Sequence, residues 1–324
     1  PMLVLTGGDC FERPDLVDLI EYAVGKGLHV SISPSVTPLF TRERVKAVQD
    51  AGVSVMSMSL DGGSAETHDA FRGFPGTFDR TIEACHMLNE LGMRFQLNTV
   101  FTAKNIHEAP QMLKNAIDLG AFMFYTFMLV PTGRGQHLDM LTPHEREDVL
   151  HWLHDNSTRI AIKTTEAPQY RRIAFQREAV RQGKAAPAKH GELYHWLTKE
   201  THELLGENIE EPRPPRTPLA INSGSGFAFI DHTGDVYPSG FLPIHCGSIK
   251  DTPFPQIYRE SEVFRALRNP SGFEGKCGAC EFNHFCGGSR STAYAMTGNY
   301  LASDPSCAHI PAGYTGELPE GIER

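Results

Sequence analysis

Four cysteines lie close together near the C-terminal end of the sequence, at a spacing that suits a metal centre. Cys277 and Cys280 are separated by two residues, Cys286 follows after five more, and Cys307 ends an Asp-Pro-Ser-Cys run. Two thiolates at positions i and i+3 across a tight turn can bind one metal centre together, and two more complete a cage. Such a cage holds an iron–sulfur cluster or a structural zinc, and the spacing alone does not choose between them.

The composition limits the class of protein in which this cage folds. Seven cysteines is an odd number, and their clustering differs from the even spread of a small secreted disulfide framework. We therefore predict a reducing cytoplasm, with a disulfide such as Cys277–Cys286 as the alternative. The formal net charge of −9 disfavours a nucleic-acid partner, which needs a basic face. The longest apolar run, residues 122–131, is too short to span a membrane.

The first half of the sequence alternates between short β-rich runs and amphipathic helical stretches. Strands are expected at residues 2–6, 28–33, 53–60, 94–101, 122–130 and 160–165. Helices are expected at residues 14–26, 41–51, 77–91, 107–119 and 142–156, several of them ended by glycine. This alternation predicts a parallel sheet with right-handed crossovers, and the spacing of the elements is near that of a β/α barrel. Chemistry in such barrels collects at the carboxyl ends of the strands.

The second half is expected to end in a smaller domain. Helical stretches at residues 169–182 and 190–206 lead to a proline-rich connector at residues 210–218. A β-hairpin over residues 227–237 and a short helix over residues 255–267 precede the cysteine segment. We therefore divide the chain into residues 1–165, a helical linker at residues 166–218 and a C-terminal domain at residues 219–324.

Glycine and polar residues, together with Val130, lie within or after several of the predicted strands and are candidate ligand contacts. In chain order they are Gly7, Gly8, Asp9, Ser59, Asp61, Arg72, Asn98, Val130 and Gly133. Glycine lets the backbone approach a ligand closely, and Arg72 could pair with a ligand carboxylate. Each residue alone also fits an ordinary turn or surface position. Their coincidence at the same rim of one sheet is what indicates a ligand site.

Taken together, these features resemble the radical SAM enzymes that carry a C-terminal SPASM or twitch iron–sulfur domain. The resemblance spans nearly the whole chain. Its most specific part is the pattern C-x2-C-x5-C-G-G followed by D-P-x-C, which Cys277, Cys280, Cys286 and Cys307 match. The resemblance implies an α/β fold, a partial (β/α)6 radical SAM barrel, plus a small domain with a β-hairpin and a cysteine-rich loop. It also implies that these four cysteines hold one auxiliary 4Fe–4S cluster.

The resemblance assigns roles to the strand-end residues as contacts to S-adenosylmethionine. Gly7, Gly8 and Asp9 would contact its amino group. Its methionine and ribose parts would be contacted by Ser59, Asp61, Arg72 and Asn98, and its adenine by Val130 and Gly133. The implied activity is radical modification of a peptide or tetrapyrrole-like substrate, begun by a 5′-deoxyadenosyl radical that abstracts a hydrogen. The implied partners are that substrate and an electron donor such as flavodoxin or ferredoxin.

The sequence departs from the family pattern in two ways. Ser239 and Arg290 stand where a two-cluster SPASM domain has cysteines, so we expect a single auxiliary cluster. The C-x3-C-x2-C triplet that holds the SAM-reducing cluster is absent, and Cys10 and Cys85 do not supply it. On the resemblance, residue 1 falls at the second barrel strand. We therefore expect an N-terminally truncated barrel without its first β/α unit, in which this chain alone is unable to cleave SAM.

Two other classes of protein remain open. One is a non-catalytic iron–sulfur electron-transfer or scaffold protein, which the missing triplet supports. The other is a zinc-stabilised β/α protein. His151 and His154 are expected on the surface, and Cys246 is expected to be a packing thiol. Residues 163–166 and 170–172 are expected at the same barrel end and are candidate substrate contacts.

Overall fold

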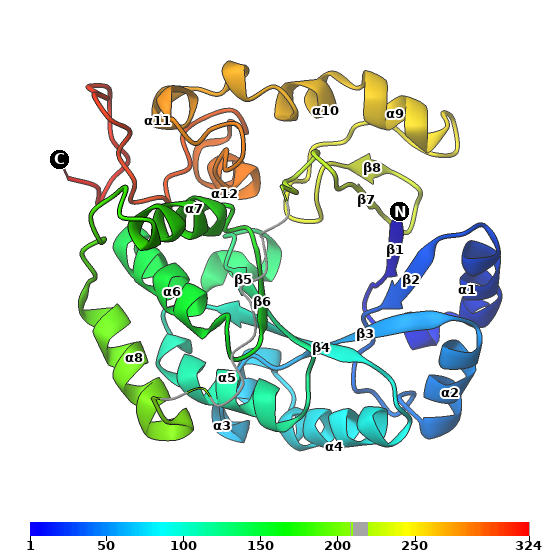
Figure 1. Cartoon of the computed structure of the whole chain (residues 1–324). Coiled ribbons are helices and arrows are strands. Elements are labelled where there is room, and N and C mark those ends of the chain that lie inside the picture. The colour runs from blue at the N-terminus through cyan, green and yellow to red at the C-terminus, as the bar shows by residue number, and fades with distance from the viewer. Residues whose placement is uncertain (208, 210–219, 324) are drawn as a thin grey trace. The chain divides into compact units, whose positions relative to one another are not determined.

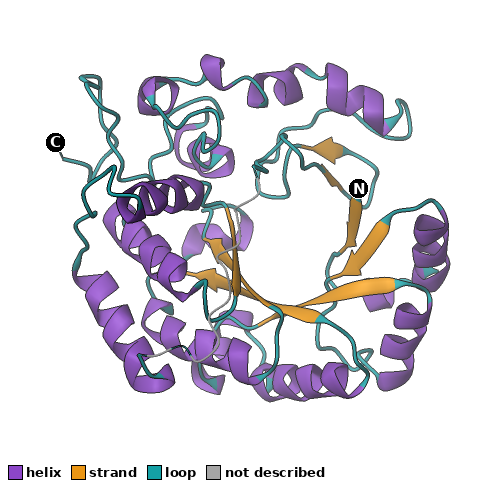
Figure 2. Ribbon diagram, in the orientation of Figure 1, coloured by secondary structure: helices purple, strands orange, loops and turns teal. Residues whose placement is uncertain are grey.

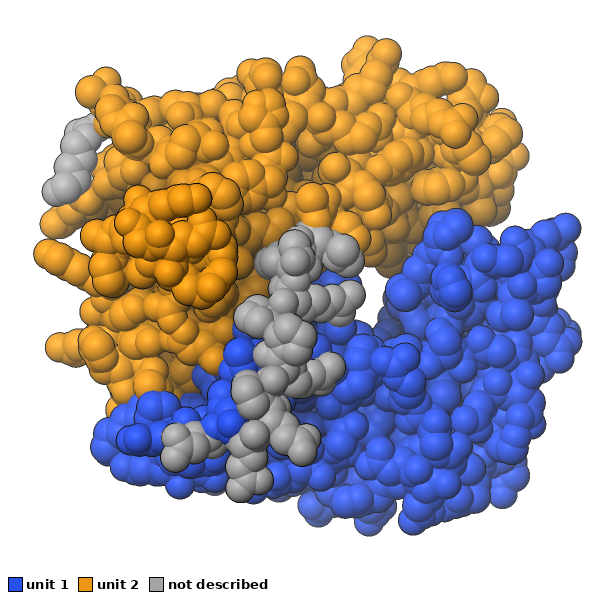
Figure 3. Space-filling model, in the orientation of Figure 1, with its two compact units in different colours: residues 1–126, 156–163, 199–215 blue, residues 127–155, 164–198, 216–324 orange. Residues whose placement is uncertain are grey.

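The computed structural model describes residues 1–207, 209 and 220–323 (Figure 1). The chain divides into two compact units, coloured in Figure 3. Unit 1 comprises Pro1–Thr126, Asn156–Lys163 and Lys199–Pro215, and unit 2 comprises Phe127–Asp155, Thr164–Thr198 and Arg216–Arg324. The predicted connector at residues 210–218 lies outside the described residues, and the three-part division of the chain stays a prediction.

A six-stranded sheet in strict chain order forms the α/β part of the fold. Its strands are β1 (Met2–Leu5), β2 (His29–Ile32), β3 (Val53–Ser59), β4 (Phe95–Phe101), β5 (Met123–Met128) and β6 (Ala161–Thr165). The first four strands pair in parallel, with Leu5 opposite Ile32 and Ser59 opposite Asn98. Sequential parallel strands joined by helices are the pattern of a β/α barrel, so the predicted partial barrel is confirmed.

The helices of unit 1 cover one face of β1 to β4 (Figure 2). They are α1 (Leu16–Gly25), α2 (Arg42–Asp50), α3 (Ala65–Arg72), α4 (Thr77–Glu90) and α5 (Ala109–Asp118), with 3-10 turns η1 (Cys10–Glu12) and η2 (Ile106–Glu108). The apolar face of each amphipathic helix packs toward the sheet, and Ile20, Val45 and Leu113 are fully buried. Helix α3 was not among the predicted helices. The Ser64 side chain caps it by accepting from the Thr67 amide at 3.4 Å.

Unit 2 contains short helices and the predicted hairpin. Its elements are η3 (Gly133–His137), α6 (Pro143–Asn156, except its last residue), α7 (Gln169–Arg181), β7 (Phe229–Ile230), β8 (Val236–Tyr237), α9 (Phe254–Glu260), α10 (Glu262–Leu267), η4 (Pro270–Gly272), α11 (Gly275–Ala279) and α12 (Arg290–Thr297). Helix α8 (Glu192–Leu205) is divided, with residues 192–198 in unit 2 and residues 199–205 in unit 1. The helix predicted over residues 255–267 is two helices, because Ser261 has extended backbone at ψ 130°. Among the described residues, no helix is both long and apolar enough to cross a membrane.

Candidate metal and cofactor sites

The four C-terminal cysteines line a single cavity in unit 2. Cys277 lies in α11, Cys280 directly follows it, and Cys286 and Cys307 come from later loops. All four are free thiols, as are the other three cysteines of the chain. The cavity is completed by Arg172, Lys276, Asn283, Gly287, Gly288, His309 and Pro311. The fold thus brings together the residues that the spacing predicted as metal ligands.

The surroundings of the thiols fit a metal cluster. The Asp304 amide donates to Cys277 Sγ at 3.2 Å, and the Phe282 amide donates to Cys280 Sγ at 3.4 Å. Such N–H···S hydrogen bonds stabilise thiolate ligands and tune the potential of iron–sulfur clusters. Burial raises the pKa of Cys286 to about 12, so a bound metal centre would be needed to hold this sulfur as a thiolate.

A histidine that the sequence did not single out also lines this cavity, and a carboxylate lies beside it. The ligand atoms of Cys280, Glu281 and His309 lie within 4.8 Å of one another. His309 Nε2 is 3.0 Å from Glu281 Oε1. His309 follows Cys307 by two residues, a spacing that could have drawn attention to it. A mixed cysteine–histidine donor set suits zinc, so the zinc alternative keeps a structural basis.

Arg290, one of the two positions where the sequence departs from the family pattern, is fully buried against the first ligand. Its guanidinium donates to Cys277 Sγ at 3.4 Å and to the Ala302 carbonyl at 2.7 Å, and it stacks over the Phe273 ring at 4.6 Å. The side chain therefore supports the loop that carries the cysteines.

Ser239, the other departure, contributes to a buried carboxylate site. Glu166 follows β6 and has φ of +56°, a left-handed conformation that is rare for a side chain of this kind. Its carboxylate accepts from Ser289 at 2.5 Å, from Ser291 at 3.0 Å and from Ser239 at 3.5 Å. Arg146 donates to the Glu166 carbonyl at 2.9 Å. This hydrogen-bonded group ties the end of β6 to the hairpin and to the start of α12.

Gly288 forms the tightest backbone approach to the cavity. Its φ is +66°, and an added Cβ would lie 3.0 Å from Cys277 Sγ and 2.8 Å from Asp304 Cβ. We expect Gly288→Ala to displace Cys277 and to lower the iron and sulfide bound after anaerobic reconstitution by more than half.

Gly298 supplies the matched control, because it also has a positive φ, +75°, but an added Cβ meets nothing within 4 Å. Gly298→Ala carries the same backbone penalty, about 1–2 kcal/mol, and should keep its metal content. Equal metal content in the two variants would contradict the expected displacement.

In unit 1, the turn after β1 presents its backbone to open space. An added Cβ at Gly7 or Gly8 would meet nothing within 4 Å, so a ligand can approach there. Asp9, by contrast, has internal partners: it accepts from the Ser35 amide at 3.3 Å and from the Thr37 hydroxyl at 2.6 Å. Asp9 therefore holds the turn in place by linking it to the loop after β2.

The turn after β3 is held by a buried polar group around Asp61, which is fully buried. The carboxylate accepts from the Val100 amide at 2.7 Å and forms an ion pair with Arg72. The Asp61 amide donates to His68 Nδ1 at 3.0 Å, and burial lowers the pKa of His68, which favours this neutral acceptor. Arg72 is therefore already paired, and about a third of its side chain is exposed at the rim.

The remaining predicted contacts fall in both units. Ser59 and Asn98 are register partners on β3 and β4, and the Asn98 side chain accepts from Gln96 at 2.9 Å. Val130 is buried, and Gly133 begins η3 with φ of +53°. The structure thus groups the unit 1 residues at the carboxyl ends of neighbouring strands, whereas Val130 and Gly133 belong to unit 2.

Comparisons with known proteins define the class of enzyme. The family model of the Radical SAM superfamily matches residues 1–116. The chain is also 39% identical over 315 residues to a protein named AdoMet-dependent heme synthase from Oleidesulfovibrio alaskensis, covering 96% of this chain and 75% of that protein. The chain therefore belongs to the radical SAM superfamily and is an enzyme whose family cofactors are a 4Fe–4S cluster and S-adenosylmethionine.

Two further relatives have the same name and a different name, respectively. The AdoMet-dependent heme synthase of Methanosarcina barkeri is 39% identical, over 96% of this chain and 83% of that protein. The PqqA peptide cyclase of Rhodopseudomonas palustris is 26% identical, over 94% of this chain and 73% of that protein.

Solved structures share the fold at low identity. Streptococcus suis SuiB bound to S-adenosylmethionine matches with a TM-score of 0.62 at 13% identity, over 95% of this chain and 66% of that chain. SuiB bound to its precursor peptide SuiA matches with a TM-score of 0.61, over 95% of this chain and 65% of that chain.

Proposed function

We propose that this protein modifies a tetrapyrrole in a SAM-dependent radical reaction of heme synthesis and carries one auxiliary 4Fe–4S cluster. The observation that carries the substrate class is the 39% identity, over nearly the whole chain, to proteins named AdoMet-dependent heme synthase. The identity to a peptide cyclase is lower, at 26%, and makes a peptide the second candidate. The single cavity lined by Cys277, Cys280, Cys286 and Cys307 supports the auxiliary cluster.

The proposed SAM site is the rim of the unit 1 sheet. The open backbone at Gly7 and Gly8 would accept the amino group of SAM, which needs carbonyl acceptors at close approach. Arg72, which keeps part of its guanidinium exposed beside Asp61, would bind the carboxylate of the methionine part. Asp9 and His68 would act indirectly, by fixing the two turns that present these groups.

When bound, SAM and its reduced cluster supply the radical that abstracts a hydrogen from the substrate. The residues of this chain would bind and orient the reactants and exclude water from them. Cys277, Cys280, Cys286 and Cys307 would hold the auxiliary cluster, which would supply electron transfer or a site that anchors the substrate. We place the protein in the cytoplasm, because free thiols at metal-ligand spacing suit a reducing compartment. An electron donor of the flavodoxin or ferredoxin type completes the proposal.

The seven cysteines of this chain include no C-x3-C-x2-C triplet, so SAM cleavage is not used as the readout. The substrate class is tested by binding instead. The anaerobically reconstituted chain is titrated with hemin in the presence of SAM and followed by the Soret absorption. We expect saturable binding of one hemin per chain with a dissociation constant in the micromolar range. A linear peptide serves as the comparison. Binding of peptides but not of hemin would reject the tetrapyrrole and favour the second candidate.

A further inference from the structure

A buried arginine lies at the wall of the four-cysteine cavity. Arg172, on α7, lines the same cavity as the cysteines, and only 3% of its side chain is exposed. Removing a guanidinium from water costs several kcal/mol unless other charges and hydrogen bonds compensate. The partners of this side chain therefore indicate why the charge is tolerated at this position.

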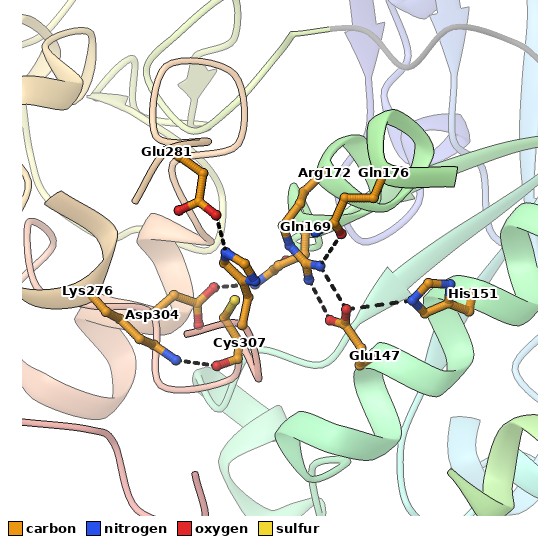
Figure 4. Close-up of polar contacts among 10 residues, drawn as sticks. Glu147, His151, Gln169, Arg172, Gln176, Lys276, Glu281, Asp304 and Cys307 are labelled. Carbon is orange, nitrogen blue, oxygen red and sulfur yellow. Dashed lines mark hydrogen bonds and ion pairs between the residues drawn. The ribbon is translucent and has the colours of Figure 1, made fainter. Parts of the chain in front are cut away.

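Part of the compensation comes from Glu147 on α6. Arg172 donates to the Glu147 carboxylate through both terminal nitrogens, at 2.8 and 2.5 Å, and to Gln176 at 2.8 Å (Figure 4). On the other side of this carboxylate, His151 Nε2 is 3.7 Å from Glu147 Oε1. His151 is buried and packs on the His190 ring at 4.6 Å, so its predicted surface position is wrong.

One nitrogen of the Arg172 guanidinium group is left without a hydrogen-bond partner among the described residues. This nitrogen is Nε, and it is buried. An unsatisfied buried N–H is costly, and a cluster sulfur or a thiolate in the cavity would accept it.

Two other buried cations near the four cysteines have different partners. Lys276, which lines the cavity, donates to the Cys307 carbonyl, and Arg290 donates to the Cys277 sulfur and to loop carbonyls. Arg172 is thus distinguished by its carboxylate partner Glu147 and by an Nε without a hydrogen-bond partner among the described residues.

We propose that Arg172, oriented by Glu147, is a positioning residue that raises the reduction potential of the auxiliary cluster. This inference rests on the proposed presence of that cluster. A cluster ligated by four thiolates is an anion that gains one negative charge on reduction. A positive charge beside it stabilises the reduced form, and a neighbouring carboxylate weakens that effect. The two members of the ion pair therefore act on the potential with opposite signs.

The test measures the potential of the auxiliary cluster by spectroelectrochemistry on anaerobically reconstituted chains, with iron and sulfide content measured in parallel. For Arg172→Met we expect the equilibrium constant for one-electron reduction to fall about tenfold, a shift of about 59 mV to lower potential. For Glu147→Gln we expect a shift to higher potential. Arg181→Met is the control: it removes an arginine of the same helix that pairs with Glu178 at the surface, and the potential should not move.

Either single variant can fail to fold, because each leaves a buried charge unpaired. The double variant Arg172→Met/Glu147→Leu removes both charges, and we expect its potential to be lowered by less than in Arg172→Met. An unchanged potential in Arg172→Met, or in the double variant, at normal iron content would overturn the proposal. A variant that binds less iron, but whose remaining clusters keep the potential of the unmodified chain, would also overturn the proposal. If the unmodified chain itself binds no iron and sulfide, the auxiliary cluster of the proposed function fails instead.

Discussion

Cys286→Ala is expected to abolish assembly of the auxiliary cluster. Cys286 is 8% exposed and lines the cavity together with the other three cysteines. Alanine offers no ligand, and a three-thiolate site would leave one corner of the cluster to solvent. After anaerobic reconstitution, the iron and sulfide per chain should fall at least fivefold, and the brown charge-transfer absorption should disappear.

Cys246→Ala is the matched control for this loss. Cys246 is also a thiol of unit 2 but is only half-buried, and its Sγ donates to the Ile244 carbonyl at 3.4 Å rather than lining the cavity. It packs against the small core of Val236, Ile257 and Phe264. The control should therefore lose some stability but keep its iron and sulfide. A Cys286→Ala chain that keeps as much iron as the control would reject the four-cysteine site.

Glu147→Ala is expected to destabilise unit 2 by about 3–5 kcal/mol, since it leaves the Arg172 guanidinium buried without its counter-charge. Both tryptophans of the chain, Trp152 and Trp196, belong to unit 2, and Trp152 is fully buried. Tryptophan fluorescence during denaturant unfolding of the metal-free chain therefore measures this unit. The Arg172→Met/Glu147→Leu variant should lie close to the unmodified chain, because it buries no lone charge.

The same ion pair predicts a loss of stability in acid. Burial raises the pKa of Glu147, but the Arg172 guanidinium and His151 outweigh burial and lower it from 4.5 to about 2. A carboxylate with a depressed pKa contributes stability that is present above the unfolded value and is lost as the pH falls toward the folded value. The unfolding free energy of the metal-free chain should therefore drop between about pH 4.5 and pH 2.

The unfolding free energy of the metal-free Arg172→Met/Glu147→Leu double variant should drop less over this range of pH. An equal acid dependence in both chains, or a Glu147→Ala chain within about 1 kcal/mol of the unmodified one, would contradict the role of the ion pair.

The strands and most helices were predictable because their signals are local. Each predicted strand through residue 165 was found within a few residues of its expected bounds, since apolar period and glycine stops act over short distances. Helix α3 is not predicted although Ser64 is a good cap, because its eight residues are too few to show a repeated helical period. The break at Ser261 was missed because nothing in residues 255–267 forbids one continuous helix.

The site was predictable only where its members are close in sequence. The cysteine spacing predicted a common cavity, and the structure brings the four thiols to one. The ion pair of Glu147 with Arg172 joins two helices and carries no sequence signature, so His151 beside it was wrongly expected on the surface. The convergence of three serines on Glu166 likewise depends on segments of unit 2 that are far apart in sequence, since Ser239 follows the hairpin and the other two serines lie at the start of α12.

The metal content of the unmodified chain tests directly whether the four C-terminal cysteines hold a 4Fe–4S cluster. After anaerobic reconstitution with iron, sulfide and zinc all available, we measure the three elements together with the absorption spectrum. We expect iron and sulfide in equal amounts, sufficient for one 4Fe–4S cluster per chain, and little zinc. Zinc without sulfide in a colourless protein would contradict the auxiliary cluster and would favour a zinc site built from the same cysteines, with His309 as a further ligand.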